Sequence, residues 1–334
     1  MINDVKVKID LTKPIGSVGL GVPLILEGSA TADITYVECA SLAEVVKAGY
    51  ADSTKTYKMA NAVFMQDNPP AKIAVCSTTT SVIDWLNETD NVTKDWRQLL
   101  IASSSEVGDT STIAAVAAKI ETLESKMYFA DGDYTKISTA TSPNCARTVL
   151  VYGTNGEYPA AALVGRTAGL AAGSYTYKNL ILKGVTPLKL TATELNTVHS
   201  KNALAIVEKA GDIVTSEGKT TSGEYIDIID SRDYVVLNLE YKTQKTLNTM
   251  DKIPYDNGGI AILESVAISV MKDAYNSGII ATNEDGTPAY AVNYAKRENT
   301  EASDRAARKY LGGQFAFSLA GAIHEVEITG EIII

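Results

Sequence analysis

Short apolar runs alternate with segments of helical periodicity in the first half of the chain, and this alternation constrains the fold more than any other feature. The apolar runs lie at 24–26, 73–76, 99–102, 127–130 and 148–152. The segments with helical spacing lie at 41–48, 56–66, 80–88, 110–125 and 158–171. Strands that alternate with helices in this way pair in parallel, and the helices cover both faces of the sheet. The pattern therefore predicts an α/β domain with a central parallel sheet over residues 18–185.

Residues 186–327 have a different pattern, in which strands and helices are not interleaved. The expected helices lie at 193–201, at 225–248 and from 256 or 257 to 276, and the expected strands at 203–207, 212–215, 314–320 and 323–334. A short charged helix also fits Ser303–Leu311. This arrangement is typical of an α+β domain.

Each end of the chain is predicted to be a strand arm, at residues 1–17 and 328–334. Residues 5–11 alternate with period two before Pro14 and several glycines. Residues 328–334 are an apolar β-former that would promote aggregation without a partner strand. Two interpretations stay open: an edge strand of its own domain, or a strand donated to a neighbouring chain by β-augmentation. The apolar residues of the arms are Val5, Val7, Ile9 and Leu11, then Ile328, Ile332, Ile333 and Ile334.

The charge and hydropathy of the chain limit its partners. Forty Asp and Glu residues against thirty Lys and Arg residues give a net charge of −10, with no basic run. Because an acidic chain repels phosphate backbones, we expect no direct nucleic-acid binding. No stretch approaches the ~20 apolar residues of a spanning helix, so we expect no membrane insertion. The three cysteines lie in or near apolar runs, which favours buried thiols in a reducing cytoplasm.

No sequence motif typical of a catalytic or ligand-binding site is complete in this chain. The two histidines, His199 and His324, lie outside the predicted α/β sheet, where a hydrolase would need its general base. The segment that begins at Asp131 lacks the Gly and Glu of a calcium loop, and 218–220 lacks the earlier glycine of a phosphate-binding loop. We therefore expect no catalytic residue, no metal and no cofactor.

A basic patch is predicted on the helix 303–311. Arg305, Arg308 and Lys309 are separated by three and four residues, which places them on one helical face. The patch is either a solvated helix face or a contact surface for an acidic partner.

Several segments follow one another in a specific order between residues 150 and 334. They are Gly153–Gly156, Ala161–Leu170, Asn179–Val185, Glu217–Asp227, Lys252–Ile260, Ser303–Arg308 and Phe315–His324. In order and spacing they resemble the contractile tail sheath proteins of myophages and of phage-like (R-type) bacteriocins. The first 150 residues match this family less distinctly.

The resemblance implies a structural protein and not an enzyme. Sheath subunits polymerise helically around a tail tube and contract to drive it through the host envelope. The resemblance implies a non-catalytic, subtilisin-like α/β domain, arms that join neighbouring subunits in shared sheets, and a C-terminal domain at 186–327 that faces the tube, with Arg305, Arg308 and Lys309 as its contacts.

The implied partners are further copies of the chain, the tail tube protein, and baseplate and tail terminator proteins. The implied location is the tail of a virion that is assembled in the cytoplasm of a bacterial host. Two alternatives remain: an α/β hydrolase-like enzyme, and another β-augmenting protein of tail assembly.

Overall fold

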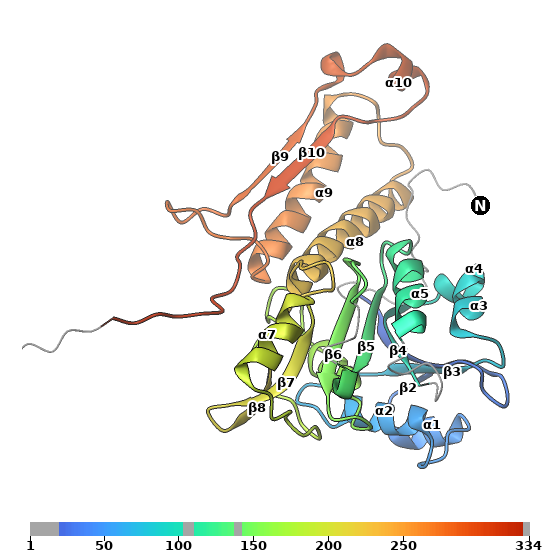
Figure 1. The fold of residues 1–334 in the computed structure, drawn as a ribbon. Coiled ribbons are helices and arrows are strands. Elements are labelled where there is room, and N and C mark those ends of the chain that lie inside the picture. Colours follow the sequence, from blue (N-terminus) through green and yellow to red (C-terminus); the bar gives the residue numbers. More distant parts are fainter. Residues whose placement is uncertain (1–19, 103–109, 137–141, 330–334) are drawn as a thin grey trace, which may run out of the picture. The chain divides into compact units, whose positions relative to one another are not determined.

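The computed structural model describes residues 20–102, 110–136 and 142–329 (Figure 1). The chain divides into two compact units, Met1–Asp251 and Lys252–Ile334. The predicted N-terminal arm at 1–17 and the last five residues lie outside the described residues.

The first unit is built on an eight-stranded sheet with the order β2-β3-β1-β4-β5-β6-β7-β8. Its strands are β1 (Val22–Glu27), β2 (Ile34–Cys39), β3 (Ile73–Ser77), β4 (Trp96–Ile101), β5 (Met127–Asp133), β6 (Thr148–Gly153), β7 (Leu204–Lys209) and β8 (Asp212–Thr215). The six inner strands run parallel, and the edge strands β2 and β8 are antiparallel to their neighbours. The fold is therefore mixed α/β.

The predicted central parallel sheet is present in the six inner strands, but both edges of the sheet are antiparallel, for one physical reason. A parallel pairing needs a crossover connection of about a dozen residues or more. Only residues 28–33 connect β1 to β2, and only Ala210 and Gly211 connect β7 to β8. Because these connections are too short for a crossover, the chain must reverse direction at each of them.

Helices cover both faces of the sheet (Figure 1). They are α1 (Leu42–Lys47), α2 (Lys55–Phe64), α3 (Val82–Asn87), α4 (Thr89–Val92), α5 (Thr110–Glu121), α6 (Pro159–Thr167), α7 (Ala192–Ser200) and α8 (Ile226–Thr249). One apolar core packs against α1, α2, α6 and the start of α8, and a second packs against α3, α5 and α7. Along β1, Ile25 joins the first core while Leu24 and Leu26 join the second, as the alternation of a strand requires.

The first unit extends to Asp251, well past the predicted domain boundary at 185. β7 pairs with β6 and β8 with β7, so residues 204–215 continue the same sheet. Ile226 and Ile229 at the start of α8 also enter the first core. A boundary at the end of the alternating pattern would therefore cut through the sheet.

The second unit contains a long helix and a β-hairpin. Its elements are α9 (Asn257–Asn276), β9 (Tyr290–Tyr294), the 3₁₀ turn η2 (Arg297–Asn299), α10 (Ala302–Ala306) and β10 (Gly313–Phe317). β9 and β10 pair antiparallel, from Gly313 opposite Tyr294 to Phe317 opposite Tyr290. One prediction is wrong here, because the helix expected over 303–311 ends at Ala306. Residues 321–329 form no strand within the described chain, and 330–334 lie outside the described residues, so the strand expected at 323–334 stays a prediction.

Close packing between α2 and α6 depends on a glycine. A Cβ atom added to Gly165 would lie closer than 3.0 Å to the carbonyl oxygen and Cα of Val63. Since both obstacles belong to the backbone of α2, no side-chain rotation can relieve the overlap. The two helices approach each other here only because Gly165 has no side chain.

We predict that Gly165→Ala lowers the free energy of unfolding of the first unit by about 1–3 kcal/mol, the usual cost of overpacking a core. The overlap should outweigh the gain of up to ~1 kcal/mol from the better helix propensity of alanine. Chemical denaturation followed by circular dichroism measures the change, and an increased stability would contradict this packing.

Candidate functional site

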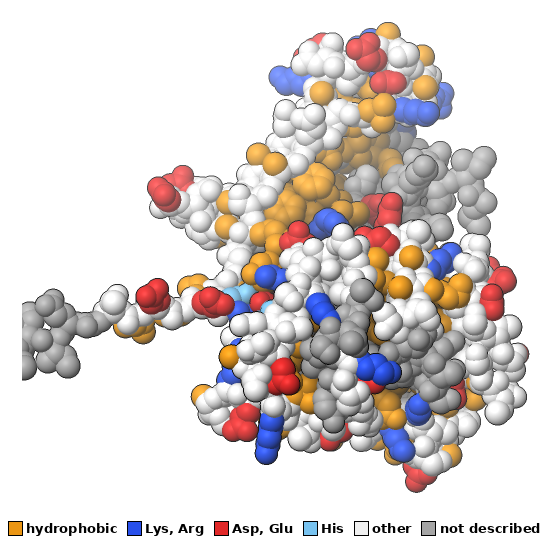
Figure 2. Space-filling view, viewed as in Figure 1, with side chains coloured by type: hydrophobic (Ala, Val, Ile, Leu, Met, Phe, Trp, Pro, Cys, Tyr) orange, Lys and Arg blue, Asp and Glu red, His pale blue; other side chains and the backbone are white. Residues whose placement is uncertain are grey.

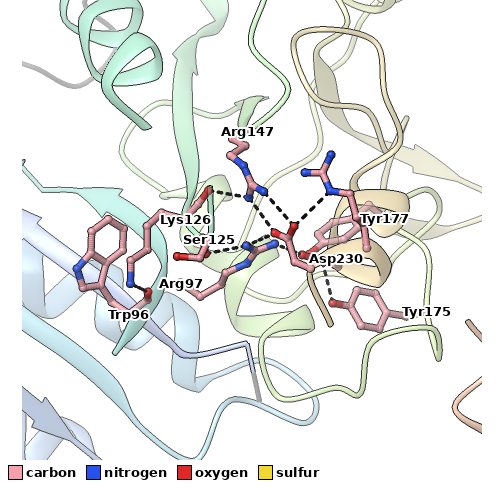
Figure 3. A network of polar contacts seen from close by, with 10 residues as sticks. Trp96, Arg97, Ser125, Lys126, Arg147, Tyr175, Tyr177 and Asp230 are labelled. Carbon is pink, nitrogen blue, oxygen red and sulfur yellow. Dashed lines mark hydrogen bonds and ion pairs between the residues drawn. The ribbon is translucent and has the colours of Figure 1, made fainter. Parts of the chain in front are cut away.

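A buried ionic network joins α8 to the sheet of the first unit (Figure 3). At its centre is Arg97 of β4, whose side chain is 1% exposed. Its Nη2 donates to Asp230 Oδ1 at 2.8 Å, and its Nη1 donates to Asp233 Oδ2 and to the carbonyl oxygen of Ser125. Asp230 and Asp233 are both on α8, so one guanidinium group binds this helix at two carboxylates.

A second arginine, directly before β6, completes the network. Arg147 Nη1 and Nη2 bind the two oxygens of Asp233 at 2.8 and 2.9 Å, a bidentate geometry. Burial by itself would raise the pKa of Asp233, but Arg97 and Arg147 outweigh it and hold that pKa below its ordinary value. The charges of two arginines and two aspartates are thus balanced inside the protein.

Two tyrosines satisfy the remaining oxygen of Asp230. Tyr177 OH donates to Asp230 Oδ2 at 2.8 Å, and Tyr175 OH donates to the same atom at 3.3 Å. Burial and the neighbouring carboxylate raise the pKa of both phenols, which keeps them protonated as donors. The carboxylates on the first two turns of α8 therefore have a complete set of partners, as buried charges require.

The hairpin of the second unit has unpaired edges. Among the described residues, β9 and β10 form a two-stranded sheet without a third strand. Phe315 on β10 is 44% exposed. The segment that follows β10 runs away from the hairpin as an extended chain (Figure 1). Ile323, Val326 and Ile328 are 86%, 74% and 87% exposed.

Lys, Arg, Asp and Glu side chains lie at the surface around α10 (Figure 2). The three cations predicted to share a helical face do not do so. Arg305 is on α10, but Arg308 follows the helix and has a φ of +57°, in the left-handed region. Arg308 and Lys309 are exposed, whereas Arg305 is half-buried.

The two histidines lie in different surroundings. His199 Nε2 is 3.0 Å from Ser216 Oγ, and burial is the main reason that the pKa of His199 is lowered. Ser216 is only 1% exposed, and its hydroxyl also accepts the N–H of Ala205. Because a substrate could not reach this hydroxyl, the pair is unsuited to nucleophilic catalysis. His324 lies half-buried after β10.

A cavity of about 210 Å³ lies at the carboxyl ends of β5 and β6. Its polar lining residues include Lys55, Asp131, Asp133, Thr154 and Asn155. Asp131 on β5 accepts the N–H of Ala160 at 2.7 Å and so caps the first turn of α6. Within the described ranges, no group of three His, Cys, Asp or Glu residues is arranged to hold a metal ion. None of the described helices is long and apolar enough to cross a membrane.

Comparison with known proteins places these features in a known fold. Residues 226–332 match the family model described as "E217 tail sheath protein gp31-like, C-terminal domain". A chain of the anti-feeding prophage baseplate is 14% identical, with a TM-score of 0.73 over 100% of this chain and 99% of that one. A chain of the contracted helical sheath of the same prophage is 14% identical, with a TM-score of 0.72 over 99% and 98%.

A chain of the contracted sheath complex of an extracellular contractile injection system, PVC, is 12% identical, with a TM-score of 0.70 over 95% of this chain and 93% of that one. This is the fold of a contractile tail sheath protein. The comparison with curated protein sequences found no match. The resemblance inferred from the sequence is confirmed.

The structure describes only some of the predicted site residues. Val5, Val7, Ile9 and Leu11, with Ile332, Ile333 and Ile334, lie outside the described residues, so their role as strand arms stays a prediction. Ile328 is described and exposed. The tube-facing role of Arg305, Arg308 and Lys309 also stays a prediction.

The ionic network was missed by the sequence analysis, although α8 opens the matched sheath domain. One signal for it existed: Arg97 stands just before the apolar run at 99–102, and a charge in a buried strand needs partners. The identity of those partners was not visible, because Asp230 is 133 residues away along the chain.

We predict that Arg147→Met lowers the free energy of unfolding by about 3–5 kcal/mol, because it leaves part of a buried carboxylate charge without its partner. Arg232→Met is the matched control. Arg232 also contacts Asp233, at 3.4 Å, but its side chain is 55% exposed, so we expect a loss below ~1 kcal/mol. Equal losses in urea denaturation would contradict the importance of the buried pair.

Asp131 and Asp133, both on β5, should change the stability of the protein with pH in opposite directions. Burial raises the pKa of Asp131 to about 7, and hydrogen bonds from Thr135 and Asn155 hold that of Asp133 below its ordinary value. The unfolded value is about 3.9 for both. Ionisation of Asp131 therefore costs stability as pH rises from about 4 to 7, whereas Asp133 contributes stability that is lost as pH falls below about 4.

We therefore predict that Asp131→Asn raises the free energy of unfolding above that of the wild type more at pH 8 than at pH 5. The difference between the two pH values should be at least about 1 kcal/mol. Asparagine can still accept the N–H of Ala160, so the helix cap is kept. Asp133→Asn should destabilise at pH 8 and lose this effect toward pH 3. Thermal melts at the three pH values measure both, and parallel curves for the two variants would contradict the assignment.

Proposed function

We propose that this chain is the structural subunit of a contractile tail sheath, which polymerises helically around a tail tube and contracts to drive the tube through a host envelope. The observation that carries this proposal is the match to a contracted sheath chain over almost the full length of both chains. The family match over 226–332 supports it independently from the sequence.

The exposed β-structure of the second unit supports polymerisation through shared sheets. A hairpin with unpaired backbone groups can add a strand from another chain. The segment after β10 supplies a suitable strand, because Ile323, Val326 and Ile328 are exposed in an extended backbone. Burial of such side chains contributes roughly 1.5–3 kcal/mol each. We therefore infer that the arms at 1–17 and 328–334 pair with hairpins of neighbouring subunits.

Contraction by this mechanism needs no nucleotide. The free energy would be stored at assembly, as a choice between two packings of the same subunits. Strand connections would let subunits rotate and slide without separating. The first unit would move as a rigid body. The subtilisin-like, non-catalytic domain that the resemblance implies would lie within this unit, and residues 186–327 would include the part that faces the tube.

The partners that follow are further copies of the chain, the tail tube, and the baseplate and terminator proteins at the tail ends. A neighbour of known structure belongs to a baseplate, which supports contact with that part of the particle. We infer assembly in the cytoplasm of a bacterial host and a final location in the particle tail. The structure offers little support for a hydrolase, because the serine beside His199 is buried.

We predict that deletion of residues 1–12 or of residues 328–334 leaves a folded, soluble subunit but abolishes long sleeves. The physical reason is that each deletion removes a strand between subunits and leaves the described cores intact. Negative-stain microscopy measures sleeve length, and an unchanged melting temperature controls for folding. Sleeves of normal length from both deletions would rule out the arms as connectors.

A further inference from the structure

We propose that the cavity at the carboxyl ends of β5 and β6 binds one hexose unit, either the terminal residue of a glycan or a free monosaccharide. The cavity has a volume of about 210 Å³ and lies within the first unit. Ligands of α/β sheets bind beyond the carboxyl ends of the strands, where loops carry the polar groups. Sheath assembly does not require this site, and the site does not require assembly.

The loop from β6 to α6 forms one wall of the cavity. Its lining residues are 153–156 and Tyr158. Gly156 has a φ of +89°, and a Cβ atom added there would meet nothing within 4 Å, so the wall is open at this point. Tyr158 is also left-handed, with φ 55° and ψ 56°. A bulky residue adopts this conformation only where its surroundings enforce it, and such residues are concentrated at functional sites.

An anion does not fit the cavity, although α6 begins beside it. The N-terminus of a helix binds anions through its free N–H groups. Here α6 begins with Pro159, which has no N–H, and the N–H of Ala160 donates to Asp131 Oδ1 at 2.7 Å. The carboxyl group of Asp131 therefore occupies the place that an anion would take.

A divalent cation does not fit either, because the second carboxylate of the lining is already bonded. Asp133 Oδ1 accepts the N–H and the hydroxyl of Thr135 at 3.1 and 2.7 Å, and the side-chain amide of Asn155 at 2.9 Å. Asp133 Oδ2 lies 3.2 Å from Lys136 Nζ. Ca²⁺ and Mg²⁺ need about six oxygen ligands or more, and Asp131 has only one oxygen left to offer.

Side-chain groups of four lining residues have no partner within the described ranges. They are Lys55 Nζ, Asp131 Oδ2, Asn155 Oδ1 and Tyr158 OH. Burial and the neighbouring Asp131 raise the pKa of Tyr158, so its hydroxyl stays a donor. Lys55 and Asp131 have opposite charges when ionised, so a ligand with a net charge would meet a repelling group. Donors and acceptors in this mixture fit a neutral molecule with several adjacent hydroxyl groups.

A hexose has this chemistry, because its hydroxyl groups both donate and accept and its ring has an apolar face. The rings of Tyr158 and Pro159 supply apolar lining for such a face. The cavity is smaller than the ~300–1,000 Å³ of sites for drug-sized ligands, which limits the ligand to about one sugar ring. So small a ligand should bind with a Kd on the order of 1 mM.

The test uses the full-length subunit and saturation-transfer NMR. The probes are glucose, galactose, mannose and N-acetylglucosamine, each as the free sugar and as its methyl glycoside. Titration calorimetry tests CaCl₂ and inorganic phosphate as competing ligands.

The variants Lys55→Met and Tyr158→Phe remove groups that have no partner in the free protein, so both should keep the melting temperature of the wild type. Lys58→Met and Tyr57→Phe are the matched controls, because both residues are on α2 and neither lines the cavity.

We expect at least one hexose to bind. Lys55→Met and Tyr158→Phe should each lower its affinity roughly threefold to tenfold, the usual effect of one lost hydrogen bond, and both controls should bind like the wild type. Binding of a methyl glycoside would support the terminal unit of a glycan as the ligand, whereas binding of the free sugar alone would support a monosaccharide.

Failure of every sugar to bind would overturn the proposal. Wild-type affinity in both Lys55→Met and Tyr158→Phe would also overturn it, because the sugar would then lie elsewhere on the protein. Binding of Ca²⁺ or phosphate but of no sugar, weakened by the same two variants, would overturn the choice of ligand.

Discussion

Two buried arginines bind two aspartates, the buried Asp230 and the half-buried Asp233, and hold α8 against the sheet of the first unit, so the position of this helix depends on them. Buried ion pairs add little stability compared with an apolar core of the same volume, since both charges lose their hydration. Their effect is on specificity, because any displacement of α8 would separate Arg97 and Arg147 from Asp230 and Asp233. The network therefore fixes one arrangement of helix and sheet.

This fixed arrangement suits the subunit of a contractile sheath. Residues 226–332 match a sheath domain, and α8 is the first element of that match. In the proposed mechanism, neighbouring subunits change their packing while each first unit keeps its own fold. The second unit differs, because the edges of its hairpin and the apolar segment after β10 can still pair with other chains.

Arginines have contrasting roles in the two units. Arg97 is fully buried among carboxylates, which raise its pKa against the effect of burial and keep it charged. Arg305 binds carbonyl groups of its own loop, and Arg308 extends into solvent beside it. The chemistry of the side chain is the same in each case, and the difference lies in the oxygen atoms that the backbone brings near it.

The sequence by itself determined the class of the fold and most of its elements. Runs such as 127–130 and 148–152 became the inner strands β5 and β6, because a continuous apolar run is stable only when both faces of the strand are buried. The lack of a usable histidine and the order of the C-terminal segments pointed to a sheath protein. The apolar runs are local, so each could be identified from a short window.

Tertiary structure alone decided the features that depend on distant residues. β2 was missed because an edge strand has one open side and no continuous apolar run. Asp230 and Asp233 appeared to be ordinary residues of a polar helix until the fold brought them to Arg97 and Arg147. Helical spacing grouped Arg305 with Arg308 and Lys309, but the helix ends at Ala306. Hydrogen bonds between residues far apart in the chain have no local signal, and only the folded chain shows which groups they join.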